Sequence, residues 1–169
     1  LLASPMFIIL GALSDRVGRK PIILGGMALA ALTYYPLYSA LNVVAEPSAL
    51  AIGNLNFWLS VAIVWVMVVY VAMVYGPIAA FLAEYFPARI RYTSVSVPYH
   101  IGNGWGGGLV PYVTSAMYAA TGSLLATLAY PILVPAVMFL LALFLMPETN
   151  RTRIWEEATL APEAGAGSD

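Results

Sequence analysis

Four long apolar runs without a charged residue constrain this chain more than any other feature. Each run is about 20 residues or longer, the length that a helix needs to cross the ~30 Å hydrocarbon core of a bilayer. The chain is 62% hydrophobic and 9% charged, whereas soluble domains are about 45–50% apolar. A soluble fold of this size could not hide so much apolar surface. The sequence therefore predicts an all-α integral membrane protein, with spans at residues 21–41, 56–82, 93–119 and 124–146.

The flanking segments complete the predicted organisation. Residues 1–13 are apolar but too short to cross a bilayer, and Leu1 is not an initiator methionine, so we expect a partial span whose beginning is missing. Residues 150–169 end in the small, acidic sequence APEAGAGSD, which predicts a partly disordered tail. We thus expect one transmembrane domain over residues 1–149. The chain has no cysteine, which excludes disulfides and thiolate metal sites, and we expect no metal and no cofactor.

The basic residues fall in every second connection between the apolar runs. Three precede the run at 21–41, two precede the run at 93–119 and two follow the run at 124–146. The connections at 42–54 and 121–123 contain none. Because cytoplasmic loops are enriched in Lys and Arg, this alternation predicts that the basic connections and the C-terminus face the cytoplasm.

The stretch GALSDRVGRKPIILGG, residues 11–26, places four charges between two apolar runs. It is not a phosphate-binding loop, because the spacing of Gly11 and Gly18 does not fit G-x-x-x-x-G-K-[ST]. Three cations beside a membrane helix are explained by topology better than by nucleic-acid binding. The simplest interpretation is a solvated turn that holds the next helix in register.

The order of residues in this stretch favours a more specific interpretation. Gly-x-x-x-Asp-Arg-x-Gly-Arg-Lys resembles the signature loop of the major facilitator superfamily. In such a loop a small residue permits close helix approach, an aspartate accepts hydrogen bonds from helix N-terminal amides, and a glycine permits a tight turn. The matching residues are Gly11, Asp15, Arg16, Gly18, Arg19 and Lys20.

Two further segments carry the resemblance to the metabolite:H⁺ symporter branch and its relatives. LAEYFPARIRYTSVSVPYHIGNGWGGGLVPYV is similar to the connection and eleventh helix of that branch, with matches at Glu84, Phe86-Pro87, Arg89, Arg91, Tyr92 and Gly106–Gly108. Pro147-Glu148-Thr149 resembles the end of the sugar-porter branches, although Asn150-Arg151 departs from their pattern. The resemblance implies a C-terminal part of a twelve-helix fold, from the end of helix eight to helix twelve. Its partner would be the missing N-terminal half of the same chain.

The resemblance also implies a function for the charged connections. They would form a salt-bridge network that closes the cytoplasmic side in the outward-facing state and breaks when that side opens. Exposed ion pairs are worth only ~0–1 kcal/mol, which suits a switch between two states of similar energy. We therefore expect secondary transport of a small polar metabolite (an organic acid, an amino acid or a betaine-like compound) by alternating access, with proton symport. The expected gate residues are Asp15, Arg16, Arg19, Lys20, Glu84, Arg89, Arg91 and Glu148.

The third apolar run is rich in glycine and polar residues. Gly102, Gly104 and Gly107 satisfy G-x-G-x-x-G, but no strand precedes them, which argues against a dinucleotide site. These glycines permit either close helix packing or bending of a transport helix, and the two can coexist.

The same run carries candidates for the wall of a substrate cavity. Histidine can titrate near physiological pH, but His100 could equally be a buried neutral residue. Asn103 would be costly at this depth unless a helix or ligand pairs with it. Tyrosines can also be packing or interfacial residues. The candidates are Tyr70, Tyr75, Tyr99, His100, Asn103 and Tyr112.

None of the four apolar runs contains Asp, Glu, Lys or Arg. A proton-coupled carrier usually needs an ionisable group within the membrane, so we expect the coupling carboxylate in helices outside this sequence. A membrane enzyme would need catalytic groups at depth, such as paired aspartates or H-E-x-x-H, and the runs hold none, so we expect no enzyme. A non-transporting receptor or sensor on the same fold is the alternative.

Overall fold

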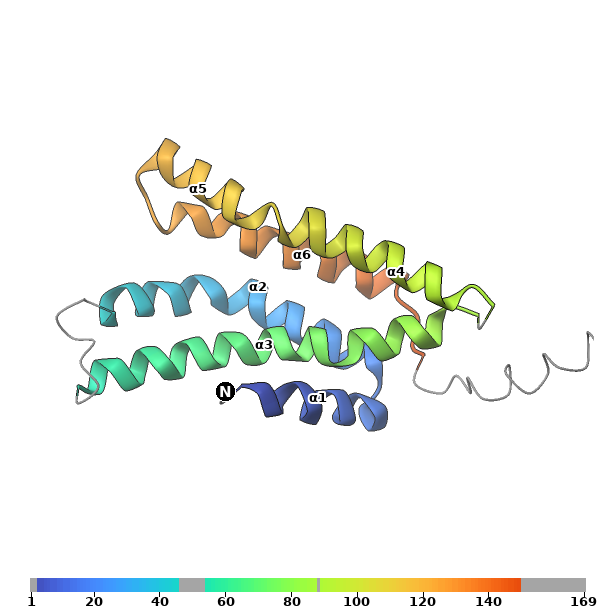
Figure 1. The fold of residues 1–169 in the computed structure, drawn as a ribbon. Coiled ribbons are helices and arrows are strands. Elements are labelled where there is room, and N and C mark those ends of the chain that lie inside the picture. Colours follow the sequence, from blue (N-terminus) through green and yellow to red (C-terminus); the bar gives the residue numbers. More distant parts are fainter. Residues whose placement is uncertain (1–2, 46–53, 88, 150–169) are drawn as a thin grey trace, which may run out of the picture.

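Every regular element that the structure describes is a helix (Figure 1). The computed structural model describes residues 3–45, 54–87 and 89–149, so the predicted tail at 150–169 lies outside the described residues. The elements are α1 (Ser4–Val17), α2 (Arg19–Val44), α3 (Leu55–Tyr85), α4 (Arg91–Ile101), the π-helix η2 (Gly102–Gly107), α5 (Val110–Thr121), the 3₁₀ turn η3 (Ala126–Leu128) and α6 (Ala129–Leu145).

The helices lie roughly side by side in one bundle (Figure 1). α3 packs on α1 and, more extensively, on α2. α2 also packs on α6, and α6 in turn contacts α5. Figure 1 shows α4, η2 and α5 running alongside α6, on the far side of α6 from α1. α2 and α6 therefore connect the α1–α3 group to the α4–α5 arm.

Glycines set the distance between α1, α2 and α3. A Cβ atom at Gly76 would lie 2.9 Å from the carbonyl oxygen of Phe7 and 3.1 Å from the amide nitrogen of Gly11. A Cβ atom at Gly26 would lie 2.9 Å from the carbonyl oxygen of Tyr70. Backbone atoms cannot move aside as flexible side chains do, so both crossings need a residue without a side chain.

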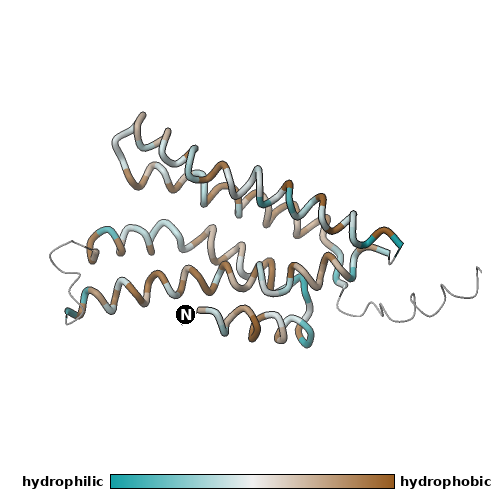
Figure 2. Tube along the Cα trace, viewed as in Figure 1, coloured by the Kyte–Doolittle hydropathy of each residue, from teal (hydrophilic) through white to brown (hydrophobic). Residues whose placement is uncertain are grey.

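Most of the large apolar side chains face outward. Leu32 is 75% exposed and Phe144 is 81% exposed, and Figure 2 shows hydrophobic positions along every helix. Three described stretches are long and apolar enough to cross a membrane: Arg19–Val44, Leu55–Tyr85 and Ala126–Leu145. In a bilayer, lipid tails cover such surfaces at no cost. The chain is an all-α membrane protein.

The predicted span at 93–119 is built from three consecutive pieces, α4, η2 and α5. The amide of Gly108 donates to the carbonyl of Asn103 at 3.0 Å, five residues back, which is the hydrogen-bond pattern of a π-helix. A Cβ atom at Gly108 would collide with the carbonyl oxygen of Gly104, so the wide turn depends on glycine there. Each piece is shorter than a bilayer crossing, and the single span at 93–119 stays a prediction.

Candidate functional site

A single residue, Gly18, connects α1 to α2 at the charged end of the bundle. Its φ of 121° is a backbone conformation that residues with a side chain rarely adopt. Its amide donates to the carbonyl of Ser14 at 3.0 Å and closes α1. A Cβ atom here would lie 2.6 Å from Oε2 of Glu148. The tight turn that the sequence predicts is present, and it leaves room for a carboxylate from the far end of the chain.

Arg19, the first residue of α2, binds three neighbours through its guanidinium group. Nη2 lies 2.5 Å from Oδ1 of Asp15 and 2.8 Å from Oε1 of Glu84. Nε donates to the second oxygen of Glu84 at 3.3 Å, and Nη1 donates to Oγ of Ser14 at 2.5 Å. The side chains of Arg19 and Glu84 are only 7% and 9% exposed. The expectation of an exposed, weak ion pair is therefore wrong for Arg19 and Glu84, because water screens a buried pair much less.

Glu148 lies beyond the end of α6, and its carboxylate caps the start of α2. Oε1 accepts a hydrogen bond from the amide of Arg19 at 2.8 Å, and Oε2 accepts one from the amide of Lys20 at 3.1 Å. The first amides of a helix have no partner within it and carry partial positive charge. The sequence predicts that Asp15 accepts hydrogen bonds from helix N-terminal amides. Among the described residues, Asp15 instead binds the side chain of Arg19, one turn later.

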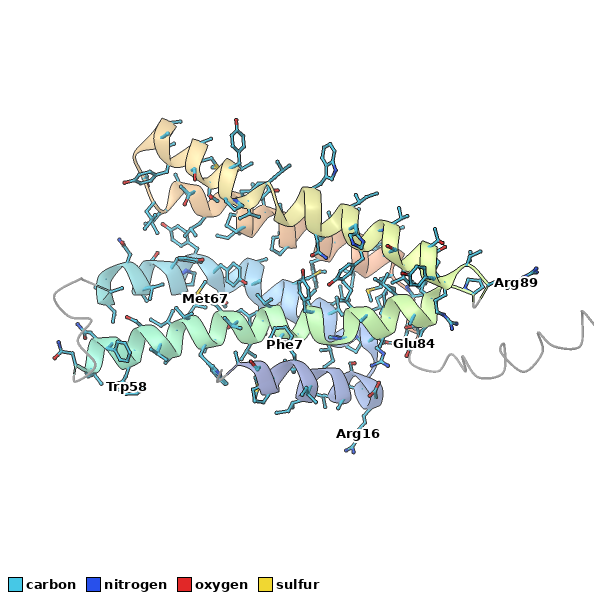
Figure 3. The ribbon with its side chains drawn as sticks, in the orientation of Figure 1. Phe7, Arg16, Trp58, Met67, Glu84 and Arg89 are labelled. Atoms are coloured by element: carbon cyan, nitrogen blue, oxygen red, sulfur yellow. The ribbon has the colours of Figure 1, made fainter. Side chains whose placement is uncertain are left out.

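Thr149 completes the connection between these groups. Its Oγ1 donates to Oε2 of Glu84 at 2.7 Å, and its amide donates to Oε1 of Glu148 at 3.1 Å. Glu84 lies near the end of α3, at the charged end of the bundle (Figure 3). The linked groups join the ends of α1, α2 and α3 to the segment that follows α6. We call this set the polar cluster: Ser14, Asp15, Arg19, Glu84, Glu148 and Thr149.

The remaining predicted gate residues lie around the polar cluster. Nζ of Lys20 donates to a carbonyl oxygen near the end of α6 at 2.9 Å. Nε of Arg91 donates to the carbonyl of Phe86 at 3.1 Å. Arg16 and Arg89 point away from the helices (Figure 3), and neither forms an ion pair with any residue that the structure describes. The structure thus separates an inner group of bound charges from an outer group of exposed cations.

Three of the predicted cavity residues come together between the helices. Tyr70 and Tyr75 of α3 line a cavity of about 260 Å³ that α2 and α6 complete. The ring of Tyr70 stacks on that of Tyr34, with 6.3 Å between centroids. The hydroxyl of Tyr75 donates to the side-chain oxygen of Asn103, which links α3 to η2. Asn103 therefore has a hydrogen-bond partner on another helix.

The other three predicted cavity residues lie apart from this group. Nδ1 of His100 lies 2.7 Å from the carbonyl oxygen of Ser96, and the exposed side chain of His100 lines an open surface hollow along α4 and η2. The ring of Tyr99 contacts that of His100 edge-on, with 6.0 Å between centroids. Tyr112 of α5 is 73% exposed and lines neither the cavity nor the hollow.

Three residues of these sites were missed by reasoning from the sequence. Ser14 lies inside the signature stretch and Thr149 directly follows Glu148, but a hydroxyl beside a carboxylate is a weak signal on its own. Tyr34 had a clearer signal. It lies one turn before Tyr38, and the two rings contact each other edge-on at 6.2 Å, as residues four apart on a helix can.

Comparison with known proteins gives a consistent set of matches. The family model of the Major Facilitator Superfamily matches residues 1–164. The chain is 33% identical over 138 residues to the alpha-ketoglutarate permease of Escherichia coli (strain K12), which covers 81% of this chain and 29% of that protein. It is also 33% identical over 113 residues to the citrate-proton symporter of Klebsiella pneumoniae, covering 66% of this chain and 23% of the relative.

The citrate-proton symporter of Salmonella typhi is 29% identical over 112 residues, covering 66% of this chain and 24% of that protein. The chain thus spans about a quarter of the length of the curated relatives that it matches. No solved structure matches.

Proposed function

The chain belongs to the major facilitator superfamily, and we propose that it forms part of a proton symporter that moves a small organic acid across a bacterial inner membrane by alternating access. The names of the relatives support the substrate class. Relatives that match most of the chain are a permease for alpha-ketoglutarate and symporters for citrate. Both named substrates are small polycarboxylates. The sequence analysis also names an amino acid or a betaine-like compound as the substrate, and these too are small polar metabolites.

The polar cluster is the observation that carries this proposal. Its hydrogen bonds and ion pairs join four helix ends that the connecting loops alone would leave independent. A group of helices joined in this way moves as one body, which rocking of two helical bundles around a central site requires. We place the charged end and the C-terminus in the cytoplasm, because every lysine and arginine that the structure describes lies at or next to a helix end on that side of the bundle. The proposed partners are the lipid bilayer, the organic acid, the proton and the N-terminal half of the transporter.

The exposed charges outside the buried ion pair are placed where they could contact the N-terminal half of the transporter. Asp15 is 61% exposed although it binds Arg19, and the exposed cations Arg16 and Arg89 have no ion-pair partner among the described residues. We propose that these three side chains pair with the opposite half when the cytoplasmic side is closed. Exposed pairs contribute about 1 kcal/mol at most, so such contacts bias the gate without locking it. In this proposal the inner pairs hold the bundle together and the outer charges form the gate.

A transport assay tests the function. The complete polypeptide that contains this chain is reconstituted into vesicles, and uptake of radiolabelled citrate, 2-oxoglutarate, proline and betaine is measured with and without an inward proton gradient. We expect gradient-driven accumulation of citrate or 2-oxoglutarate rather than of proline or betaine. Uptake that needs no gradient would overturn the symport claim, and no uptake of any compound on the panel would overturn the substrate class.

The variant Asp15→Asn tests the gate. It removes the exposed charge but keeps the size of the side chain, so it shifts the balance between the two gate states. A bias of about 1 kcal/mol changes a population ratio about fivefold. We expect turnover to fall two- to fivefold while the substrate Kd changes little. Equal effects on turnover and Kd, or unchanged uptake, would contradict a gating role for Asp15.

A further inference from the structure

Among the described lysines and arginines, Lys20 and Arg91 belong neither to the polar cluster nor to the proposed gate. Nζ of Lys20, in the first turn of α2, donates to the carbonyl of Leu143 on α6 at 2.9 Å. Nε of Arg91, the first residue of α4, donates to the carbonyl of Phe86 at 3.1 Å. A lysine has three donors and an arginine five, so neither contact uses up the donors of its side chain.

An apolar groove lies beside these two cations. Its volume is about 430 Å³, and residues of α2, α3, α4 and α6 line it. Phe86, whose carbonyl binds Arg91, is part of the lining, and so is Ala142, the neighbour of the residue that binds Lys20. None of the described residues that line the groove is charged. The groove therefore combines an apolar interior with two cations at its rim.

The groove extends along the helices over about one leaflet of a bilayer. Its lining includes Phe86 and Pro147, which lie just beyond the ends of α3 and α6, at the charged end of the bundle. It reaches Met27 of α2, eight positions after Arg19 or ~12 Å along the helix. Half of the hydrocarbon core of a bilayer is ~15 Å thick. The groove thus has the direction and depth of a single acyl chain.

The side chains that line the groove suit an occupant of variable shape. Three of the seven methionines of the chain, Met27, Met138 and Met146, line it. Methionine side chains are flexible and adapt to irregular apolar ligands. Met138 and Leu141 of α6 are exposed, so this wall of the groove is not covered by the helices that the structure describes. In a bilayer, acyl chains cover exposed apolar surface.

The charges around the rim favour an anionic head group. Both oxygens of Glu148 accept hydrogen bonds from backbone amides, and Glu84 is paired with Arg19. Lys20 forms no ion pair with any residue that the structure describes. The carboxylates at this end are thus held by other groups, while Lys20 and Arg91 bring positive charge to the groove. A phosphate is a strong acceptor for both side chains.

We propose that the groove binds an anionic phospholipid of the leaflet at the charged end, with one acyl chain in the groove and the phosphate held by Lys20 and Arg91. Such a lipid contacts α2, α3, α4 and α6 together. In the proposed orientation this is the cytoplasmic leaflet, where basic sites between membrane helices bind anionic head groups. The inference concerns a lipid rather than the substrate, so it goes beyond the proposed function.

Binding of two lipids that differ only in the head group tests the role of the cations. The complete polypeptide that contains this chain is purified in detergent and titrated with phosphatidylglycerol or with phosphatidylcholine of the same acyl chains. Native mass spectrometry measures the Kd of the first bound lipid. We expect phosphatidylglycerol to bind at least about tenfold more tightly, because each cation near an anionic head group contributes roughly a factor of five.

Variants of the cations separate the site from general surface charge. We expect Lys20→Gln and Arg91→Gln each to reduce the preference for phosphatidylglycerol about fivefold. Arg16→Gln is the matched control, because Arg16 lies at the same end of the bundle but points away from the helices (Figure 3). We expect it to change the preference by less than about twofold. Equal affinity for the two lipids, or an equal loss in Arg16→Gln, would overturn the assignment of the head group.

Two neighbouring leucines of α6 test the place of the acyl chain. Leu141 and Leu140 are 47% and 55% exposed, but only Leu141 lines the groove. An indole in the groove displaces several methylene groups, each worth roughly fourfold in affinity. We therefore expect Leu141→Trp to weaken the binding of phosphatidylglycerol at least about tenfold, and Leu140→Trp to change it by less than about twofold. If Leu141→Trp does not fold, Leu145→Trp serves the same comparison, since Leu145 also lines the groove and is exposed.

Unchanged binding in the tryptophan variants of the groove would overturn the site and would mean that another segment of the transporter fills the groove. Loss of binding in Leu140→Trp to the same extent would also overturn it, because the effect would then not depend on the groove. None of these measurements involves transport. Their failure would therefore leave the proposed function standing, and failure of the uptake assay would leave the lipid site standing.

Discussion

Arg19 shows at the scale of single residues how one side chain organises the polar cluster. Its guanidinium group binds Asp15 one turn earlier and Glu84 on a different helix. A buried guanidinium without a partner would be strongly unfavourable, because nothing would replace the water that it loses. The pairing with Glu84 therefore fixes where the end of α3 lies relative to the start of α2.

The variant Glu84→Gln tests this pairing. Glutamine keeps the shape but loses the charge that balances Arg19, while the contact with Asp15 remains. We expect the free energy of unfolding in detergent to fall by roughly 1–3 kcal/mol. Arg16→Gln is the control, because Arg16 is exposed and has no ion-pair partner among the described residues; we expect a change within about 0.5 kcal/mol. Equal stability of the two variants would contradict the role given to Glu84.

Two glycines with positive φ allow a second comparison at this scale. Gly18 has φ 121° and little space, since a Cβ atom would lie 2.6 Å from Glu148, whereas Gly122 has φ 66° and no heavy atom within 4 Å of a Cβ position. We expect Gly18→Ala to lower the midpoint of thermal unfolding clearly more than Gly122→Ala, because only the first change also displaces the carboxylate that caps α2. The cost at Gly122 is the backbone term alone, of order 1–2 kcal/mol. A larger loss for Gly122→Ala would show that Glu148 moves aside freely.

At the scale of the helices, the crossing of α1 and α3 is asymmetric. A Cβ atom at Gly76 would lie 2.9 Å from the backbone of α1, whereas a Cβ atom at Gly11 would lie 3.5 Å from the backbone of α3, an ordinary contact distance. We expect Gly76→Ala to destabilise the protein by about 1–3 kcal/mol, as overpacking does, and Gly11→Ala to have little effect. Thermal unfolding of the two purified variants measures the difference. Similar values would mean that the helices separate easily.

The same crossing shows what the sequence can predict and what it cannot. Glycine in a membrane helix indicates close contact, and Gly11 is predicted to allow one. The partner, Gly76, lies 65 positions away, and helix periodicity contains no information about which helices meet. The glycines of the third run predict packing or bending, but the choice of a π turn depends on the hydrogen bond between Gly108 and Asn103, which no spacing rule foresees.

Only part of the polar cluster could be predicted, again because the sequence does not tell which helix ends meet. Charge placement and the signature order indicate that Asp15, Arg19, Glu84 and Glu148 gather at one end. Which carboxylate caps α2 and which binds the guanidinium depends on the positions of helix ends to within about one turn. The signature order gives an amide-binding role to Asp15, but the carboxylate that binds the first amides of α2 is that of Glu148, in the segment after α6.

At the scale of the whole molecule, orientation in the membrane is the next property to test. Residues 1–169 contain no cysteine, so a cysteine introduced here adds a new labelling site that is compared with the unmodified transporter. We expect Ser123→Cys to react with a membrane-impermeant maleimide added to intact cells, because the turn at 121–123 lies at the proposed outer side. We expect Arg16→Cys to react only after the membrane is permeabilised. Labelling of both from outside, or the reverse pattern, would contradict the proposed topology.

The cap on α2 also determines when this protein can finish folding. The carboxylate of Glu148 follows the amide of Arg19 by 129 positions. At a synthesis rate of ~5–20 residues per second, the ribosome needs roughly 6–26 s to make that stretch. During this time the first turn of α2 lacks the carboxylate that binds its amides in the folded protein, so this helix end stays uncapped until Glu148 has been synthesised. A nascent chain interrupted before Glu148 would therefore contain every described helix and still lack the contact that fixes their ends together.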